Sequence, residues 1–399
     1  MERQQKLIEQ GEEYLLKTYS QVPVVFASGK GCTLTDSEGN EYLDFVGGIA
    51  VNALGYGDKG LTKALTDVLD SGLLHCSNLY FNEKAIEGAK AICDLAELDK
   101  VFFCNSGAES NEAALKLSRK FGHRSSPART EIISMKGSFH GRTYGSVTAT
   151  GQAKYHQYFD PLPQGFCYAQ FNDLESVRAL ITGQTCAILV EPIQGEGGVV
   201  PATKAFLQGL RELCDEHDLL LIYDEVQCGM GRSGKPFAWQ LYEVKPDVLT
   251  LAKALAGGVP CGAMLTNKKA SGILGPGDHA STFGGNALAL AGVCEMAHRL
   301  GETELCKEVT EKGEFLRSKL SEIQKKYPTI CTAVRGFGLM NGLALTIPPR
   351  QVVEACFAKG LLVLSAGSDV LRFVPPLIIS TDEIEKAMAI VDEVLATLS

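Results

Sequence analysis

The sequence predicts an α/β fold in which a large domain holds a mostly parallel sheet and both ends of the chain form a smaller α+β domain. Short apolar runs, each the length of one buried strand, alternate with longer helical or mixed stretches. In such folds, ligands bind at the carboxyl ends of the strands. The expected strands are Val101–Phe103, Glu131–Met135, Ala187–Val190, Leu219–Tyr223 and Val248–Leu251.

The C-terminal part of the chain follows a different pattern. Gly338–Leu345 and Leu371–Val374 have the composition of strands, and the chain then ends in an amphipathic helix. Ser380 and Glu383 have the spacing of a capping box at the start of that helix. Apolar residues follow at intervals of three or four positions, at Ile384, Met388, Val391, Leu395 and Leu398.

These patterns predict how the chain divides into domains. Residues 60–295 are expected to form the large domain. Residues 1–59 are expected to join residues 296–399 in the small domain, because the strand-helix alternation is confined to the middle of the chain. No linker rich in proline, glycine or serine marks the boundaries.

Composition narrows the function classes. The formal net charge of −9 argues against nucleic acid or an anionic membrane as partner. No apolar run reaches membrane-spanning length. The 13 cysteines form no CxxC pair and no zinc-like cluster with histidine, which predicts reduced thiols and no metal site. We therefore expect a cytoplasmic protein, or the processed form of one from an organelle interior.

The segment from Leu219 to Gly234 carries the first candidate chemistry. Asp224 and Glu225 directly follow an apolar strand, so they lie where α/β sites form. A carboxylate there suits a protonated ring nitrogen. Taken alone, the pair equally suits an acid that caps the next turn or binds a metal.

A lysine follows another apolar strand. Lys253 comes after Val248–Leu251 and precedes Gly257 and Gly258. Burial would lower the pKa of its amine and make it a usable nucleophile and proton carrier. The alternative is a lysine whose ammonium reaches the surface, because burying that charge is costly.

The next motif predicts an anion site at a helix N-terminus. The strand at residues 101–103 leads into Ser106, and Glu109 stands at capping-box distance. Gly107 and Ala108 would then lie in the first turn, whose free N–H groups bind phosphate. An ordinary capped helix without a ligand gives the same pattern.

Three further groups are candidates for ring and substrate contacts. Phe139 could stack on a flat ring with His140 beside it, and Arg142 offers a fork for a carboxylate. Ser281 and Thr282 stand among small residues that suit a phosphate or substrate pocket. The candidates for a carboxylate clamp and its counter-ion are Glu191, Glu196 and Arg372. Turns, core packing and weak surface salt bridges are the alternatives.

The motifs together resemble a known family. In chain order, SGAE, SFHGRT, EPIQGEGG, DEVQCGMGRSG, LAKALAGG, STFGGN and LRFVPP are similar to the class III (omega-amino acid) aminotransferases. The resemblance extends from Thr35 to the final helix, and motifs in register over this length are far more specific than any single one. It implies the fold-type I architecture and pyridoxal 5'-phosphate (PLP) as cofactor.

The resemblance also implies roles for individual residues. Lys253 would carry PLP as a Schiff base and move protons, while Asp224 pairs with the pyridine nitrogen; these two are the implied catalytic residues. Thr282 would reach the phosphate of the neighbouring subunit's cofactor, which implies a homodimer. The other implied cofactor-binding residues are Ser106, Gly107, Ala108, Phe139, His140, Glu225, Val226 and Gln227.

The implied reaction uses two substrates in turn. N2-acetyl-L-ornithine would give up its δ-amine, and 2-oxoglutarate would accept it to become glutamate. Arg142 and Ser281 would hold the first substrate, with Arg142 on its α-carboxylate, and Arg372 would bind glutamate. Glu196 would pair with Arg372 while the first substrate is bound, and Glu191 completes the implied substrate-binding set.

One departure from related enzymes bears on the substrate. Ornithine aminotransferases carry a tyrosine just before the Ala-Val-Asn stretch, where this chain has Gly48 and Ile49. The loss of that hydroxyl favours an acylated amine over free ornithine. Succinylornithine, succinyldiaminopimelate, ornithine and 4-aminobutyrate stay open as donors.

Other classes of protein also stay open. Aminomutases and decarboxylases share the fold, and a non-catalytic vitamin-B6-binding sensor would share the cofactor site. A nicotinamide-dependent dehydrogenase is disfavoured, because Gly336 and Gly338 form the only similar glycine run and their spacing is wrong.

Overall fold

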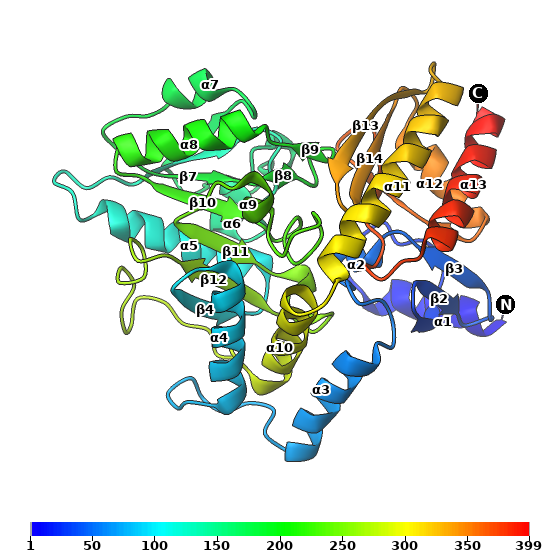
Figure 1. Cartoon of the computed structure of the whole chain (residues 1–399), viewed down its shortest axis with the longest axis horizontal. Helices are drawn as coiled ribbons and strands as arrows, with labels where there is room; N and C mark the ends of the chain where they lie inside the picture. The colour runs from blue at the N-terminus through cyan, green and yellow to red at the C-terminus, as the bar shows by residue number, and fades with distance from the viewer. Residues whose placement is uncertain (1, 399) are drawn as a thin grey trace.

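A seven-stranded sheet lies at the centre of the larger part of the molecule (Figure 1). The computed structural model describes residues 2–398. In spatial order the strands are β4 (Lys100–Cys104), β12 (Gly262–Thr266), β11 (Val248–Leu251), β10 (Leu220–Asp224), β7 (Thr185–Val190), β5 (Glu131–Met135) and β6 (Phe166–Ala169). Each apolar run expected to be a strand forms one, and β5 and β11 have the predicted bounds.

The sheet is parallel except for β12, which is antiparallel to both of its neighbours. Only residues 252–261 separate β11 from β12. A parallel crossover needs a dozen or more residues, so this return is too short for one. The chain therefore reverses beyond the end of β11, and Lys253 lies in the reversal.

Helices cover both faces of the sheet. Leu189 of β7 clusters with Leu117 on one face, and the next residue, Val190, clusters with Leu210 on the other. The helices and 3-10 turns of this part are α3 (Lys59–Ser71), α4 (Glu83–Ala96), α5 (Gly107–Gly122), α6 (Tyr144–Ala149), η1 (Ala153–Tyr155), α7 (Leu174–Arg178), α8 (Lys204–Glu216), α9 (Ala238–Tyr242), η2 (Lys253–Ala256) and α10 (Ala287–Gly301). A short hairpin pairs β8 (Ile193–Gln194) with β9 (Val200–Pro201).

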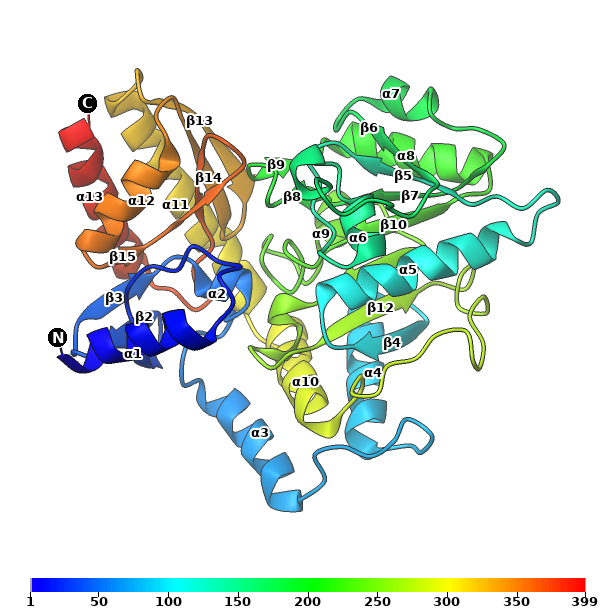
Figure 2. The same ribbon diagram turned by 180° about the vertical axis from the view of Figure 1, so that it is seen from behind.

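Segments from both ends of the chain form the smaller part, and the two termini lie on its side of the molecule (Figures 1 and 2). One sheet contains β1 (Phe26–Lys30), β2 (Thr33–Asp36), β3 (Glu41–Asp44) and β15 (Leu361–Leu362). The other contains β13 (Cys331–Phe337), β14 (Met340–Leu345), β17 (Val370–Phe373) and β16 (Leu364–Ala366). The helices are α1 (Glu2–Tyr14), α11 (Leu305–Lys326), α12 (Pro349–Ala358) and α13 (Thr381–Leu398).

The pairing of β15 with β3 joins the two ends of the chain: Leu361 lies opposite Leu43 in parallel register. The division at residues 59/60 and 295/296 stays a prediction. The capping box at the start of α13 is confirmed, because Ser380 N donates to Glu383 Oε2 at 2.8 Å and Glu383 N donates to Ser380 Oγ at 3.2 Å.

The turn α2 (Gly47–Ala50) has left-handed backbone geometry. All four of its residues have positive φ, including Ile49 at 66°. Such a conformation is costly for a β-branched residue. Asp44 holds the turn, because its Oδ1 accepts hydrogen bonds from Val46 N at 2.8 Å and Gly47 N at 3.0 Å.

In the part of the chain that the structure describes, no helix combines the length and the apolar character needed to cross a membrane.

Candidate active site

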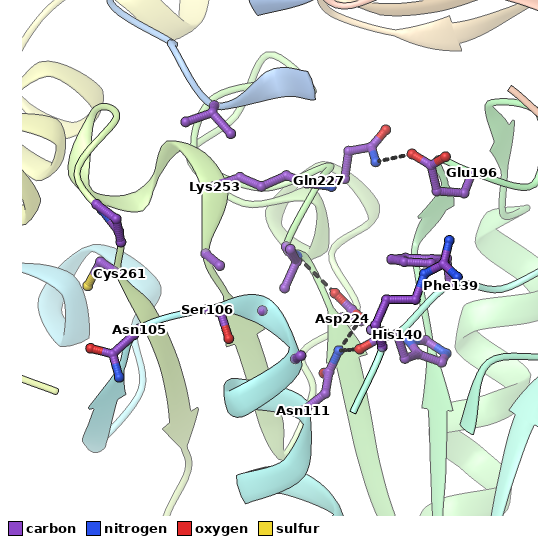
Figure 3. A pocket seen from close by; sticks show the side chains of 18 of the residues that line it. Asn105, Ser106, Asn111, Phe139, His140, Glu196, Asp224, Gln227, Lys253 and Cys261 are labelled. Carbon is purple, nitrogen blue, oxygen red and sulfur yellow. Dashed lines mark hydrogen bonds and ion pairs between the residues drawn. The ribbon is translucent and has the colours of Figure 1, made fainter. Parts of the chain in front are cut away.

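A cavity of about 450 Å³ lies at the carboxyl ends of β4, β5, β7, β10 and β11 (Figure 3). This is the position expected for a ligand site in an α/β sheet. The residues predicted from the sequence that line it are Ser106, Gly107, Ala108, Phe139, His140, Arg142, Glu191, Glu196, Asp224, Val226, Gln227 and Lys253.

The N-terminus of α5 forms one wall. Ser106 Oγ accepts a hydrogen bond from Glu109 N at 3.2 Å, so Ser106 caps the helix as predicted. The amide N–H groups of Gly107 and Ala108 have no partner within the described chain and lie at the cavity. A Cβ at residue 107 would lie 2.8 Å from Val226 Cγ1, so the close packing requires glycine there. Unpaired amides at a helix N-terminus suit a phosphate group.

Asp224 lies at the end of β10 with its carboxylate held by three donors. Oδ1 accepts from Val226 N at 3.0 Å, and Oδ2 accepts from Asn111 Nδ2 at 2.7 Å. His140 Nδ1 lies 2.8 Å from the same Oδ2, and because a carboxylate only accepts, this nitrogen carries the proton. Three donors from different segments thus hold the carboxylate in one orientation.

Lys253 begins the turn η2 and lies in the cavity without a hydrogen bond or ion pair to any described residue (Figure 3). Its φ of 49° places the backbone in the left-handed region, which costs about 1–2 kcal/mol for a residue other than glycine. Burial lowers the pKa of the amine, although the negative charge of Glu196 opposes the shift. An amine with a lowered pKa is a better nucleophile near neutral pH.

Arg372, on β17, does not line the cavity itself but forms an ion pair with Glu196, which does. Its Nη1 donates to Glu196 Oε1 at 2.6 Å and to Gln227 Oε1 at 2.8 Å, while Gln227 Nε2 donates to Glu196 Oε1 at 3.2 Å. Burial raises the pKa of Glu196, but its attraction to Arg372 and its hydrogen bonds outweigh burial and leave the pKa lowered. Glu196 and Arg372 are therefore paired, as predicted.

Arg142 is the second arginine of the site. Its guanidinium lies 4.1 Å from the centre of the Tyr155 ring and 5.4 Å from that of Phe139. No carboxylate of the described residues forms an ion pair with it. Stacking thus holds a guanidinium at the cavity with its fork free for an anion.

Both carboxylate oxygens of Glu191 accept hydrogen bonds from backbone amides. Oε1 accepts from Phe139 N at 2.8 Å, and Oε2 accepts from Gly195 N at 3.1 Å. Burial is the main cause that raises its pKa to about 7, opposed by His140. A direct contact between Glu191 and substrate stays a prediction, because its oxygens already have partners in the protein.

The assignment of Glu225 to cofactor binding stays a prediction, because its side chain points away from the cavity. Its side chain does not line the cavity but accepts hydrogen bonds from Ala238 N at 2.6 Å and Trp239 N at 2.8 Å. Successive side chains of an extended chain point to opposite sides, so Asp224 facing the cavity turns Glu225 toward α9. Burial raises the pKa of Glu225 to about 8.

Ser281 and Thr282 lie at a separate hollow of about 690 Å³ rather than in the cavity of Lys253. Ser281 is linked to that cavity indirectly, because Asn105 Nδ2 donates to Ser281 Oγ at 3.2 Å and Asn105 lines the cavity. Within one subunit the structure therefore does not bring Thr282 to the other predicted cofactor-binding residues.

Sequence reasoning missed Asn111, which lines the cavity and bonds to Asp224 (Figure 3). The signal was present, since Asn111 interrupts the apolar face that Ala113, Ala114 and Leu117 give to α5. It also lies four residues after Gly107, which places both on the same side of the helix. Val51, Asn105 and Cys261 also line the cavity and were missed.

With the fold and this site in place, the chain belongs to the class III aminotransferases, since the family model "Aminotransferase class-III" matches residues 14–395. It is 46% identical over 384 residues to an acetylornithine aminotransferase from Clostridium acetobutylicum, covering 96% of this chain and 99% of that protein. It is also 46% identical over 389 residues to a succinylornithine transaminase from Yersinia pseudotuberculosis serotype I, covering 95% and 94%.

A solved structure has the same fold. It is an ornithine aminotransferase from Toxoplasma gondii with partial occupancy of PLP at its active site. Its TM-score is 0.94 at 31% identity, over 99% of this chain and 94% of that chain. The chain is therefore a PLP-dependent aminotransferase of the fold-type I architecture.

The residues at the cavity fit PLP. The unpaired amides of Gly107 and Ala108 suit its phosphate, and the carboxylate of Asp224 suits its ring nitrogen. Lys253 supplies an amine that forms no hydrogen bond with any residue the structure describes. The phosphate, the ring nitrogen and the aldehyde of the cofactor thus each have a complementary group at the cavity.

We predict that the free energy of unfolding of the cofactor-free enzyme falls as pH rises from about 5 to about 9. Glu225 and Glu191 have raised pKa values in the folded chain, so the unfolded chain releases their protons first. The two carboxyl groups therefore contribute their full stability below the ordinary glutamate pKa. That contribution is lost as pH rises through the folded-state pKa values of about 7 for Glu191 and about 8 for Glu225. The effect is a few kcal/mol, measured by urea denaturation across this pH range.

Glu225→Gln should make this pH dependence shallower, although the amide replaces one acceptor and lowers stability at acidic pH. Glu175→Gln is the matched control, because the Glu175 side chain is 81% exposed. If Glu225→Gln and Glu175→Gln retain the same pH slope as wild type, the carboxylate of Glu225 is not the source of the loss.

Proposed function

We propose that the enzyme transfers the δ-amino group of N2-acetyl-L-ornithine to 2-oxoglutarate. The products are N-acetyl-L-glutamate 5-semialdehyde and L-glutamate, as in arginine biosynthesis. The observation that carries this proposal is that the site contains two arginines, of which one is paired with a carboxylate and the other is not. Arg142 has a free guanidinium, whereas Arg372 is paired with Glu196. One site can thus accept two amines whose carboxylates lie at different distances from the reacting nitrogen.

The cofactor and the protein divide the chemistry. Bound PLP supplies an electron-withdrawing ring that stabilises negative charge at the substrate carbon. Lys253 would hold PLP covalently and then carry a proton at Nζ, which its lowered pKa permits. Asp224 would hold the proton of the ring nitrogen. The N–H groups of Gly107 and Ala108 would hold the phosphate.

The substrate arginines would act in turn. Arg142 would bind the α-carboxylate of the acylated ornithine, which leaves the δ-amine near Lys253. Arg372 would bind 2-oxoglutarate once Glu196 moves away, and the ion pair between Glu196 and Arg372 keeps the positive charge covered until then. The site would therefore present one free arginine to the first substrate and uncover the other for the second.

The acyl group of the donor is the finer part of the proposal. Gly48 and Ile49 place no hydroxyl at the turn before Val51, which lines the cavity. This supports an acylated amine rather than free ornithine. Succinylornithine is the second candidate, because the Yersinia succinylornithine transaminase is as similar as the Clostridium relative.

We also propose a homodimer with shared active sites. Large apolar side chains are exposed in the two segments of the chain that line the hollow at Thr282. Leu79 is 87% exposed, Phe81 95% and Phe283 61%. Large exposed apolar groups of this kind are typical of interfaces. A partner seated on them would bring its cofactor phosphate to Thr282.

For location, we propose the cytoplasm or the interior of an organelle. Cysteines in the described chain form no disulfide, and burial raises the pKa of most of these thiols. Reduced thiols persist in such compartments.

A single-turnover absorption assay tests the donor. Cofactor-loaded enzyme is mixed with N-acetylornithine, succinylornithine, ornithine or 4-aminobutyrate, and conversion of the lysine-bound cofactor to its amine form is followed. We expect N-acetylornithine to react fastest. Lys253→Ala should lower the rate by roughly a thousandfold or more, since it removes both the nucleophile and the proton carrier.

Borohydride reduction and peptide mapping provide the control for this assay. The reduced cofactor should be attached to Lys253 in wild type and in Lys245→Ala, an exposed lysine variant. Attachment to another lysine contradicts the proposed mechanism, whereas faster reaction with another donor keeps the mechanism and changes the substrate.

Replacing each of the two arginines should slow a different half-reaction. Arg142→Ala should slow the N-acetylornithine half-reaction about tenfold to a hundredfold, because one charge-assisted carboxylate contact is lost. Arg372→Ala should slow the half-reaction with 2-oxoglutarate by a similar factor. Each half-reaction is measured separately in the stopped flow. Equal losses in both half-reactions for either variant would contradict the assigned roles.

Phe81→Asp should dissociate the dimer and lower activity, because a charge at an apolar interface is costly. Analytical ultracentrifugation of cofactor-loaded protein measures the mass, with Lys307→Asp as a control that adds negative charge at a side chain 70% exposed on α11. A Phe81→Asp protein that stays dimeric, or a monomeric wild type, contradicts the proposed interface.

A further inference from the structure

We propose that Asn111 is a positioning residue for the cofactor: its amide, oriented by Thr250, holds the carboxylate of Asp224 toward the ring nitrogen. This inference rests on the proposed function, because it assumes that PLP occupies the cavity. It assigns a role to a pair of side chains that do not react.

Asn111 connects three elements around Asp224. Its Nδ2 donates to Asp224 Oδ2 at 2.7 Å and to the backbone oxygen of His140 at 2.8 Å. Its Oδ1 accepts from Thr250 Oγ1 at 2.7 Å. Asn111 is 1% exposed and Thr250 fully buried, so water does not compete for these bonds. Both amide hydrogens and the amide oxygen are therefore in use.

The surroundings determine which way the amide points. Asp224 Oδ2 and His140 O are acceptors only, so the side of the amide that faces them must be the nitrogen. The opposite side faces the hydroxyl of Thr250, which donates to Oδ1. Reversing the amide would place an oxygen against two oxygens in a buried setting. Thr250 thus fixes the amide, and the amide fixes Asp224.

The neighbouring helix residues show that this is more than the burial of a polar side chain. Ser110 Oγ donates to Gly107 O at 2.8 Å and Ser118 Oγ donates to Ala114 O at 2.7 Å, both within α5. These hydroxyls are satisfied by their own helix. Among the described residues, the side chain of Asn111 bonds to groups outside α5, on β10, on β11 and on the loop after β5.

A fixed donor matters because acidic side chains surround Asp224. Glu191 and Glu225 both interact electrostatically with Asp224, and their raised pKa values reflect burial first and this repulsion in addition. Donors to Oδ2 offset the repulsion and hold the carboxylate in one orientation. The other titratable groups near Asp224 or in the same network are His140, Glu196, Cys228, Lys253 and Arg372.

The test uses three variants of the PLP-loaded enzyme and a fourth as control. Asn111→Leu removes the donor at similar volume. Thr250→Val removes only the hydroxyl that orients the amide, and Thr250→Ser restores it. Ser118→Ala is the matched control, because it deletes a buried hydroxyl of α5 that touches neither Asp224 nor the cavity.

Two measurements separate positioning from simple structural support. The first is the dissociation constant of PLP. The second is the pH midpoint of the absorption change of the lysine-bound cofactor, which rises when the ring nitrogen holds its proton less firmly. For Asn111→Leu we expect about tenfold weaker PLP binding and a midpoint higher by roughly one pH unit, because one charge-assisted hydrogen bond is lost. Thr250→Val should change both in the same direction by less.

Thr250→Ser and Ser118→Ala should match wild type in both measurements. If Asn111→Leu and Thr250→Val lower only the melting temperature and leave the midpoint and PLP affinity unchanged, the inference is overturned. If Asn111→Leu does not fold, the Thr250→Val and Thr250→Ser pair decides alone. A wild type that fails to attach PLP to Lys253 would instead overturn the proposed function.

Discussion

The site is organised around a carboxylate that is buried away from bulk water. Asp224 is 3% exposed, and an unpaired carboxylate at that position would cost several kcal/mol. Its partners come from different elements: Asn111 from α5, His140 from the loop after β5 and Val226 from its own turn. Satisfying this one group therefore brings together the strand ends and the helix N-terminus that form the cavity.

The basic side chains of the site also differ in how they are held by their partners. Lys253 forms no hydrogen bond within residues 2–398, which keeps its amine available, whereas Arg372 is paired with Glu196 and Gln227. Arg142 lies between these extremes, held by stacking on Tyr155. Three cations around one cavity are thus kept in three different states, and this difference matches the successive tasks that an aminotransferase performs.

Much of the site was predictable because motifs place residues at strand ends, and strand ends meet in an α/β sheet. Asp224 ends β10 and Lys253 follows β11 for this reason. What sequence could not give was side-chain direction: the alternation of the chain turns Glu225 to α9, where it accepts from backbone amides. Asn111 was missed because its partners are distant in sequence, and a motif does not show that a helix faces a carboxylate. The antiparallel β12 follows from a short connection, which the apolar runs alone do not reveal.

The pairing of β3 with β15 has a consequence for biosynthesis. Leu43 and Leu361 are neighbours in one sheet although nearly the whole chain lies between them. The ribosome releases the first strands long before the last one, so β3 has an unpaired edge throughout translation. The central sheet, whose strands all lie between residues 100 and 266, is complete well before then. The larger part can therefore fold during synthesis, while the smaller sheet closes only near the end of translation.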